Sequence, residues 1–335
     1  MTIREEAEAR EKLMFRPGAA FSVNSLGRDR QEKQCDIRTV YQRDRDRILH
    51  SKSFRRLKHK TQVFLSPRGD HYRTRLTHTL EVSQLSRTIA KALQLNDDLA
   101  DAIALGHDLG HTPFGHTGEN ALNEMCPLGF SHVEQSVRIV ELLEKDGAGL
   151  NLTWEVRDGI RNHRTSGTPR TMEGSIVRFC DKIAYINHDI DDAERAGILK
   201  EEDIPLEHRR VLGFSTRERL NTLIHDVIES SKDADMITMS QEVEHQMKEL
   251  RKFMFSHVYR NPVAKSEEPK AAAMIQALYE YYARNIELMP REYISLIDKG
   301  EDERRVVCDY ISGMTDQYSI QKFTELFVPK AWQPY

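Results

Sequence analysis

Cysteine is scarce in this chain of 335 residues, and long apolar runs are missing. No cysteine belongs to a C-x-x-C pair, which argues against a disulfide framework or a thiolate zinc site and favours a reducing compartment. No stretch approaches the roughly 20 apolar residues that a membrane span needs. The charged start of the chain lacks the apolar segment of a signal peptide. We therefore expect a cytoplasmic protein with no membrane partner. The four cysteines are Cys35, Cys126, Cys180 and Cys308.

Glycine-rich nucleotide loops are also missing. The chain contains neither the G-x-x-x-x-G-K-[ST] loop of P-loop enzymes nor a G-x-G-x-x-G turn, so side chains must hold any phosphate. No repeat with a period of about 20–50 residues is present, which disfavours a solenoid. Hydrophobic residues make up 39% and charged residues 30%, which is typical of a soluble globular protein that can bury a core.

The net charge of −4 hides a strongly basic segment between Tyr41 and Arg75. This segment contains eleven lysines and arginines and three aspartates, so it carries +8 on an acidic chain. Such a segment suits an anionic ligand better than a general coat for nucleic acid. An equally good interpretation for most of these side chains is a solvated helix face whose arginines and aspartates pair with one another.

Apolar residues recur at helical spacing along most of the chain, and the alternation typical of strands is scarce. The predicted fold is therefore all-α. A polar stretch with a proline at residues 264–270 suggests a boundary between a main domain (36–260) and a C-terminal helical portion (261–335). Residues 1–35 are expected to form an N-terminal arm. The predicted helices cover residues 36–60, 73–94, 97–109, 116–125, 131–145, 153–163, 172–193, 215–231, 239–259, 268–284, 287–298 and 301–327.

Histidines next to helical stripes are the first candidates for chemistry. His78 shares an apolar stripe with Val82, so it faces the interior of the protein. His107-Asp108 ends a predicted helix, from which one nitrogen and one oxygen can reach the same metal ion. Taken alone, a buried histidine is more often a core residue than a ligand, and a His-Asp pair is common.

The next segment, from Gly110 to Glu119, is a shaped loop that contains three glycines and a proline. His116 and Glu119 stand three residues apart, a spacing at which a carboxylate can orient an imidazole if a helix begins there. Such a pair is the arrangement of a general acid–base dyad. Because five histidine, aspartate and glutamate residues fall within the thirteen positions from His107 to Glu119, a polar surface loop is a poor explanation.

The segment from Asp181 to Asp189 places Asp181, Tyr185 and Asp189 at four-residue steps on one helix face, with Lys182 beside them. Alone, this segment predicts an amphipathic helix with a solvated polar face. Together with the two segments above, Asp181 completes a set of two imidazoles and two carboxylates. Such a set suits Mn²⁺, Mg²⁺, Co²⁺ or Fe²⁺. It leaves positions open for water and a phosphate oxygen, as phosphate-ester hydrolysis requires.

The order His78, His107-Asp108, Asp181 is similar to the HD-domain phosphohydrolase superfamily. The sequence HDLGHTPFGHTGE, from His107 to Glu119, is narrower and resembles the deoxyguanosinetriphosphate triphosphohydrolases and their bacterial dNTPase-like relatives. FRRLKHKTQVF (54–64), RTRLTHTLEV (73–82) and ISGMTDQYSI (311–320) look like further motifs of that family. The resemblance implies an all-α HD-domain fold with a C-terminal helical extension.

The resemblance also implies roles for individual residues. His116 matches the catalytic histidine and Glu119 its carboxylate partner, with His111 the next candidate for the acid. The implied metal ligands are His78, His107, Asp108 and Asp181. The implied groups around the triphosphate are Arg75, His111, His132 and Lys182. Around the deoxyribose, where a 2′-hydroxyl would clash, the implied residues are Gln62, Tyr185 and Asp189. Further candidates for the nucleotide site are His257 and Tyr259.

The implied reaction converts a deoxynucleoside triphosphate and water into a deoxynucleoside and inorganic triphosphate. Water attacks the α-phosphorus, and His116, held by Glu119, donates a proton to the departing 5′-oxygen. The resemblance also implies a homo-oligomer. A single-stranded nucleic acid is a candidate regulator.

Two other interpretations stay open. One is a different HD phosphohydrolase that acts on nucleoside monophosphates, cyclic dinucleotides or alarmones. The narrow loop motif argues against it, and only the dNTPase reaction releases inorganic triphosphate. The other is a non-catalytic module that binds nucleotides or single-stranded nucleic acid through residues 41–75. Its affinity would fall steeply with salt and it would show no turnover.

Overall fold

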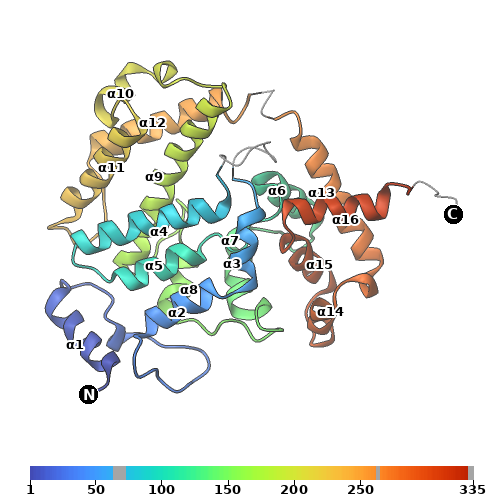
Figure 1. Ribbon diagram of the computed structural model, residues 1–335, viewed down its shortest axis with the longest axis horizontal. Coiled ribbons are helices and arrows are strands. Elements are labelled where there is room, and N and C mark those ends of the chain that lie inside the picture. The colour runs from blue at the N-terminus through green and yellow to red at the C-terminus, as the bar shows by residue number, and fades with distance from the viewer. Residues whose placement is uncertain (63–72, 262–264, 331–335) are drawn as a thin grey trace.

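The computed structural model describes residues 1–62, 73–261 and 265–330, which fold into α-helices joined by loops and short 3₁₀ turns (Figure 1). Within these ranges the chain forms no β-strand, only two isolated β-bridges. The prediction of an all-α fold is confirmed. None of the helices in the described ranges is long and apolar enough to cross a membrane.

Three helices form the centre of the molecule: α4 (Arg75–Ala92), α5 (Asp97–Gly106) and α9 (Met172–Arg195). Helix α4 packs against both α5 and α9, and α5 also packs against α9. Their apolar stripes meet in one hydrophobic cluster, the first core, in which side chains such as Ile89 and Ile103 are fully buried. The first core therefore fixes the relative positions of three segments that lie far apart in the sequence.

Each central helix begins at a polar cap. The side chains of Thr74, Asn96 and Thr171 each accept a hydrogen bond from the backbone N–H three residues further on. Such caps satisfy donors that lack a partner within the helix and typically stabilise it by about 1 kcal/mol. Helix α5 ends where His107 follows its last residue, so this histidine stands at a helix terminus.

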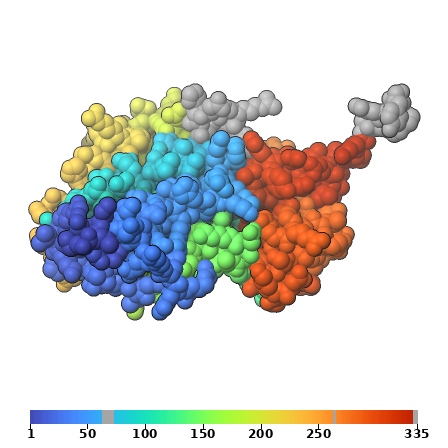
Figure 2. Space-filling model, turned by 60° about the horizontal axis from the view of Figure 1, so that its bottom comes forward, coloured from blue at the N-terminus to red at the C-terminus, as the bar shows by residue number. Residues whose placement is uncertain are grey.

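A second hydrophobic cluster, the second core, lies beside the first. Figure 1 shows its C-terminal helices on the right of the molecule, and Figure 2 shows them as a lobe in orange and red. Helix α6 packs on α13 and α15 and so belongs to this core, although its first two turns carry two predicted catalytic residues. The helices that surround the second core are α6 (Gly115–Met125), α13 (Glu268–Arg284), α14 (Arg291–Asp298), α15 (Glu303–Ser312) and α16 (Asp316–Phe327).

The remaining helices cover the first core. Helices α2 and α8 pack on α5, α11 and α12 pack on α9, and α10 packs on α12. Helix α7 continues into a π-helical turn at residues 139–143. These helices are α1 (Ile3–Met14), α2 (Val40–Leu49), α3 (Lys52–Arg56), α7 (His132–Arg138), α8 (Trp154–Arg161), α10 (Leu206–Leu212), α11 (Thr216–Ser231) and α12 (Gln241–His257).

Two predicted helices are wrong as single elements. The segment 36–60 divides into α2, α3 and a 3₁₀ turn, because the Ser51 side chain caps a new helix by accepting from the Phe54 N–H (3.1 Å). The segment 301–327 divides into α15 and α16, because Thr315 caps α16 in the same way. Helices α1 and α10 were not predicted at all.

Candidate active site

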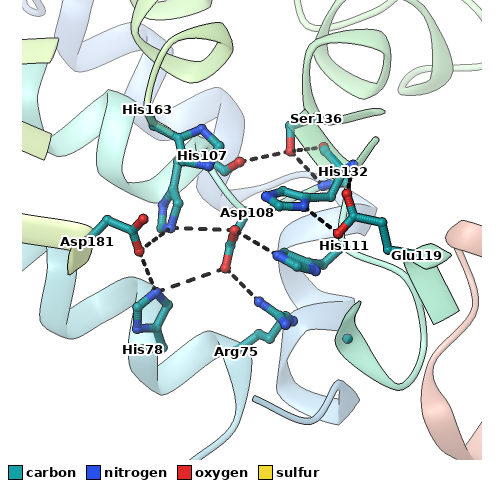
Figure 3. Close-up of polar contacts among 12 residues, drawn as sticks. Arg75, His78, His107, Asp108, His111, Glu119, His132, Ser136, His163 and Asp181 are labelled. Carbon is teal, nitrogen blue, oxygen red and sulfur yellow. Dashed lines mark hydrogen bonds and ion pairs between the residues drawn. The ribbon is translucent and has the colours of Figure 1, made fainter. Parts of the chain in front are cut away.

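Four side chains from three segments meet where α4, the end of α5 and α9 approach one another (Figure 3). His78 Nε2 lies 3.2 Å from Asp181 Oδ1 and 4.0 Å from Asp108 Oδ2. His107 Nε2 lies 3.6 Å from Asp108 Oδ1 and 3.7 Å from Asp181 Oδ1. Two imidazole nitrogens therefore face two carboxylates. The structure brings together the four residues that the sequence predicts as metal ligands.

The backbone fixes the tautomer of His107. Its Nδ1 donates a hydrogen bond to the Ala104 carbonyl (2.6 Å), so Nε2 carries the lone pair. Nε2 is buried and has no hydrogen-bond partner among the described residues. A buried polar atom without a partner costs about 1–3 kcal/mol, and a cation between Nε2 and the two carboxylates would remove this cost. The donor set fits a hard or borderline divalent cation.

Burial opposes ionisation of both carboxyl groups in this cluster, but their neighbours outweigh it. The surrounding histidines and Arg75 hold the pKa of Asp108 well below its usual value. Arg75 Nη1 also donates a hydrogen bond to Asp108 Oδ2 (2.9 Å). The hydrogen bond from His78 and the nearby imidazoles lower the pKa of Asp181 to about 2. Both carboxylates are therefore anionic and suited to a cation.

The loop between α5 and α6 turns sharply. A Cβ at Gly110 would lie 2.2 Å from the backbone nitrogen of Ser136, so only glycine fits this close approach to α7. Phe114 and Gly115 both adopt left-handed backbone angles, with φ of 61° and 55°. A phenylalanine in this region is strained and needs support from its surroundings. Asp316 of α16 supplies it by accepting a hydrogen bond from the Phe114 N–H (3.0 Å).

Glu119, on α6, has more partners than the sequence predicts. Its Oε2 lies 3.1 Å from His116 Nδ1 and 2.8 Å from His132 Nδ1. Its Oε1 accepts from the His132 N–H (3.0 Å) and from Arg164 Nη2 (2.7 Å). Despite burial, these partners hold the pKa of Glu119 far below its usual value. The carboxylate is therefore a fixed anion. The His116 side chain is 60% exposed, and its Nε2 makes no hydrogen bond to another described residue.

The predicted phosphate-binding side chains fall into two groups. The rings of His111 and His132 stack with their centroids 3.8 Å apart, and burial lowers the pKa of both imidazoles. Arg75 lies beside them, on Asp108. Lys182 lies apart, because its Nζ sits 5.6 Å from the centroid of the Phe179 ring and forms no hydrogen bond or ion pair with a described residue. The structure therefore groups Arg75 with the two histidines but not Lys182.

The predicted sugar-binding residues include buried polar atoms that make no hydrogen bond to a described residue. Gln62 Oε1 and Asp189 Oδ1 are buried and have no partner within the described ranges. Burial raises the pKa of Asp189 well above its usual value. The Tyr259 hydroxyl donates to Asp189 Oδ2, and the Tyr259 ring stacks on Tyr185 with centroids 5.8 Å apart. Tyr259 therefore joins this group, whereas the side chain of His257 is exposed.

The basic segment between Tyr41 and Arg75 contains two kinds of positive side chain, some paired at the surface and one buried near the site. The arginines of α2 pair with neighbouring carboxylates, as a solvated helix face does; these partners include Glu32, Asp46 and Asp98. Lys60 is buried instead, and its ammonium donates to the carbonyl oxygens of His111 and Ser312. Arg68 and Asp70 lie outside the described residues. Lys60 therefore connects the site loop to α15.

Two residues near the cluster were not predicted from the sequence. The His163 ring lies 5.0 Å from the His107 ring, and burial lowers the pKa of His163 to about 4. Arg164 binds Glu119 across 45 positions of sequence. The available signal is the run Arg-Asn-His-Arg at residues 161–164, which gathers basic side chains and a histidine shortly before the turn at Ser166-Gly167.

Comparison with known families agrees with this geometry. The HD domain matches residues 75–186, a range that contains the His-Asp cluster, and the phosphohydrolase-associated domain matches residues 237–325. The fold and the site thus define an HD-domain phosphohydrolase. A solved phosphohydrolase from Bacteroides thetaiotaomicron has a similar fold, with a TM-score of 0.51, 18% identity and coverage of 84% of this chain and 67% of that chain.

Curated relatives narrow the family. Over 332 residues the chain is 55% identical to a deoxyguanosinetriphosphate triphosphohydrolase-like protein of Caldanaerobacter subterraneus, covering 99% of this chain and 98% of that protein. A protein of the same name from Clostridium perfringens strain SM101 is 50% identical over 339 residues, covering 98% of this chain and 99% of that protein. The chain belongs to the deoxyguanosinetriphosphate triphosphohydrolase-like proteins, and the resemblance inferred from its motifs is confirmed.

Proposed function

We propose that this chain hydrolyses deoxynucleoside triphosphates to deoxynucleosides and inorganic triphosphate. The observation that carries the proposal is the fixed, unpartnered Nε2 of His107, which faces two carboxylates beside the Glu119–His116 pair. The names of the relatives support a deoxynucleoside triphosphate as the substrate. The residues that would hold a divalent cation are His78, His107, Asp108 and Asp181. When bound, the cation would act as a Lewis acid toward a phosphate oxygen.

Arg75 is the main positive charge that the chain itself directs at the phosphates. Its Nε is buried and has no described partner, while Nη1 stays on Asp108, so the guanidinium can bind both a phosphate and the carboxylate. Burial favours the neutral forms of His111 and His132, and the single proton of each ring faces a carboxylate, Asp108 (3.3 Å) for His111 and Glu119 (2.8 Å) for His132, so the two rings shape the phosphate site without adding charge to it. Lys182 can add a second charge if its flexible side chain leaves the Phe179 ring.

His116 donates a proton to the departing 5′-oxygen. Glu119 accepts from His116 Nδ1, so Nε2 is the atom that delivers the proton, and the fixed anion stabilises the imidazolium form. The exposure of the His116 side chain suits a group that must meet an incoming nucleotide. An alkoxide is a poor leaving group, so we expect this proton to accelerate the reaction by about 10²–10⁴-fold.

Asp189 and Gln62 suit the sugar. Each has a buried oxygen that lacks a donor, and the 3′-hydroxyl of a deoxyribose can supply one. Tyr185, stacked on Tyr259, would form the wall against which a 2′-hydroxyl clashes. This pocket supports deoxyribose over ribose. A homo-oligomer and a single-stranded nucleic acid regulator stay predictions.

The deciding experiment is product analysis. The purified chain is incubated with each dNTP and each NTP in the presence of Mn²⁺ or Mg²⁺, and the products are separated by anion exchange. We expect inorganic triphosphate and the free deoxynucleoside. Release of pyrophosphate or orthophosphate, or nucleotide binding without turnover, would contradict the proposed reaction.

A further inference from the structure

A chain of polar atoms leads away from the proposed cation site through His188. His188 Nδ1 lies 3.3 Å from His78 Nδ1, and the two rings are nearly perpendicular. On the other edge of the same ring, His188 Nε2 contacts the Glu81 carboxylate. His78 and His188 are both buried, at 1% and 4% exposure. The contacts therefore run without a break from Glu81 on α4, through His188 on α9, and back to His78 on α4.

Glu81 sets the direction of these hydrogen bonds. A carboxylate can only accept, so His188 Nε2 must carry a proton. A neutral His188 then has a bare Nδ1, which accepts the proton that lies between the two rings. That proton belongs to His78 Nδ1, so His78 Nε2 is left with its lone pair. This lone pair faces Asp108 and Asp181, and a cation placed between them replaces the hydrogen bond that a proton on Nε2 would make to Asp181 Oδ1 (3.2 Å).

When a cation occupies the site, the opposite set of tautomers is unfavourable. With its proton on Nε2, His78 would need His188 to donate from Nδ1. A neutral His188 would then present a bare Nε2 to the Glu81 carboxylate, and two acceptors in contact repel one another. Arg73 keeps the carboxylate in place, because its Nε lies 3.4 Å from each Glu81 oxygen while its Nη1 pairs with Asp191 on α9.

We infer that Glu81 and His188 are positioning residues that lock His78 in the tautomer whose Nε2 can bind a divalent cation. The inference rests on the proposed cation site and adds two residues to it. The two imidazole ligands are thus locked by different devices. His107 donates to a backbone carbonyl, whereas His78 donates to a second imidazole that is itself held by a carboxylate. Supporting contacts of this kind orient a ligand and raise its basicity.

The test measures the tautomer of His78 and the affinity for Mn²⁺ in the full chain. In the Mg²⁺-loaded wild type, long-range ¹H–¹⁵N spectra should show the proton of His78 on Nδ1 and that of His188 on Nε2. His188→Leu should move His78 toward the Nε2–H form, which free imidazole side chains prefer. It should also weaken Mn²⁺ binding by about 10–100-fold, the usual effect of losing such a contact.

Two further variants separate positioning from a merely structural role. His188→Asn keeps an acceptor close to the position of Nδ1, so it should restore most of the affinity that His188→Leu loses. Glu81→Gln should weaken Mn²⁺ binding by about 10-fold, because an amide can either accept or donate and no longer forces one tautomer. Thermal melting monitored by circular dichroism establishes that each variant is folded.

Asp191→Asn is the matched control. It removes the same negative charge from the same Arg73 cluster, but Asp191 pairs with Arg73 and Arg195 rather than with either imidazole. Its Mn²⁺ affinity should stay within about twofold of the wild type, against the 10–100-fold expected for His188→Leu. A Mg²⁺-loaded wild type with His78 protonated on Nε2, or a folded His188→Leu with unchanged affinity, would overturn the inference. A wild type that binds no Mn²⁺ would instead overturn the proposed cation site.

Discussion

Replacing Asp316 with alanine should weaken both the fold and catalysis, although this residue lies near the end of the described chain. Asp316 is the first residue of α16 and is 3% exposed. Its Oδ1 accepts from the Phe114 N–H (3.0 Å), and its Oδ2 accepts from the Thr61 N–H (3.0 Å) and Oγ1 (2.7 Å). One buried carboxylate thus holds the strained turn before α6 and the segment that precedes the predicted sugar residue Gln62.

The expected magnitude follows from these contacts. Each hydrogen bond to a charged acceptor contributes about 1.5–3 kcal/mol, and alanine would leave two backbone donors without a partner. Water that enters the vacated space would satisfy part of this demand, so we expect Asp316→Ala to cost about 3–5 kcal/mol of unfolding free energy. Asp316→Asn keeps one acceptor for Phe114 but turns an amide N–H₂ toward Thr61, so it should cost about 2 kcal/mol.

The turnover of Asp316→Ala should fall for a separate reason. Without Asp316, the left-handed turn at Phe114 can relax, and His116, two residues later, would lose its position. We expect turnover to fall about 10-fold or more because small displacements of an acid are costly. Mn²⁺ affinity should change little, because the proposed ligands belong to α4, α9 and the end of α5.

Urea unfolding at a fixed Mn²⁺ concentration and steady-state dNTP hydrolysis provide the assay. Asp302→Ala is the control, because Asp302 caps α15 by accepting from the Arg305 N–H (3.0 Å) and is exposed. Loss of this cap should cost about 1 kcal/mol and leave turnover unchanged. The reasoning is refuted if Asp316→Ala loses no more stability than Asp302→Ala, or if it keeps full turnover.

Three further predictions test the site and the core. His116→Ala should keep its cation but lose about 10²-fold or more in turnover, whereas Asp181→Ala should lose both. Metal content and hydrolysis measured on the same preparations check this prediction. If both variants lost their metal, His116 would have to be counted among the ligands. Hydrolysis of GTP should be far slower than that of dGTP, and comparable rates would count against the pocket of Gln62, Tyr185 and Asp189. Finally, burial raises the pKa of Glu173, so the folded chain binds this proton more tightly than the unfolded chain, and stability falls as pH rises from the usual glutamate range. Glu173→Gln can keep an acceptor for the N–H groups of Ala20 and Asn96, so it should raise the melting temperature more at about pH 8 than at about pH 5; equal shifts would contradict this.

The sequence was sufficient to bring the four proposed ligands into one hypothesis, because they lie at helix positions that a repeated apolar period makes visible. His78 and Asp181 sit on helices with clear apolar stripes, and His107-Asp108 directly precedes a glycine-bounded loop. The acid–base pair was visible for the same reason, since His116 and Glu119 are three residues apart. Spacing along a helix is therefore enough to show which side chains of one segment lie on the same face.

Contacts between distant segments could not be predicted. Arg164 reaches Glu119 only because the fold brings the loop after α8 next to Glu119 and His132, and Glu81 reaches His188 only because α4 packs on α9. The motif ISGMTDQYSI was visible as a motif, but the partners of its Asp316 depend on the fold. The divisions within the predicted 36–60 and 301–327 helices were missed because the single capping residues Ser51 and Thr315 interrupt an apolar period that continues across them.

The uneven burial of the proposed ligands implies an order of events during turnover. The side chains of His78, His107 and Asp108 are 1–6% exposed, whereas that of Asp181 is 26% exposed, so Asp181 forms the mouth of the cluster. A nucleotide whose phosphate meets the cation must lie across this mouth. A cation held by these ligands would then bind before the nucleotide and would leave only after the products, which is a compulsory-order scheme. A chelator should therefore stop the free enzyme quickly but act slowly at saturating dNTP, because the bound nucleotide closes the path by which the ion escapes.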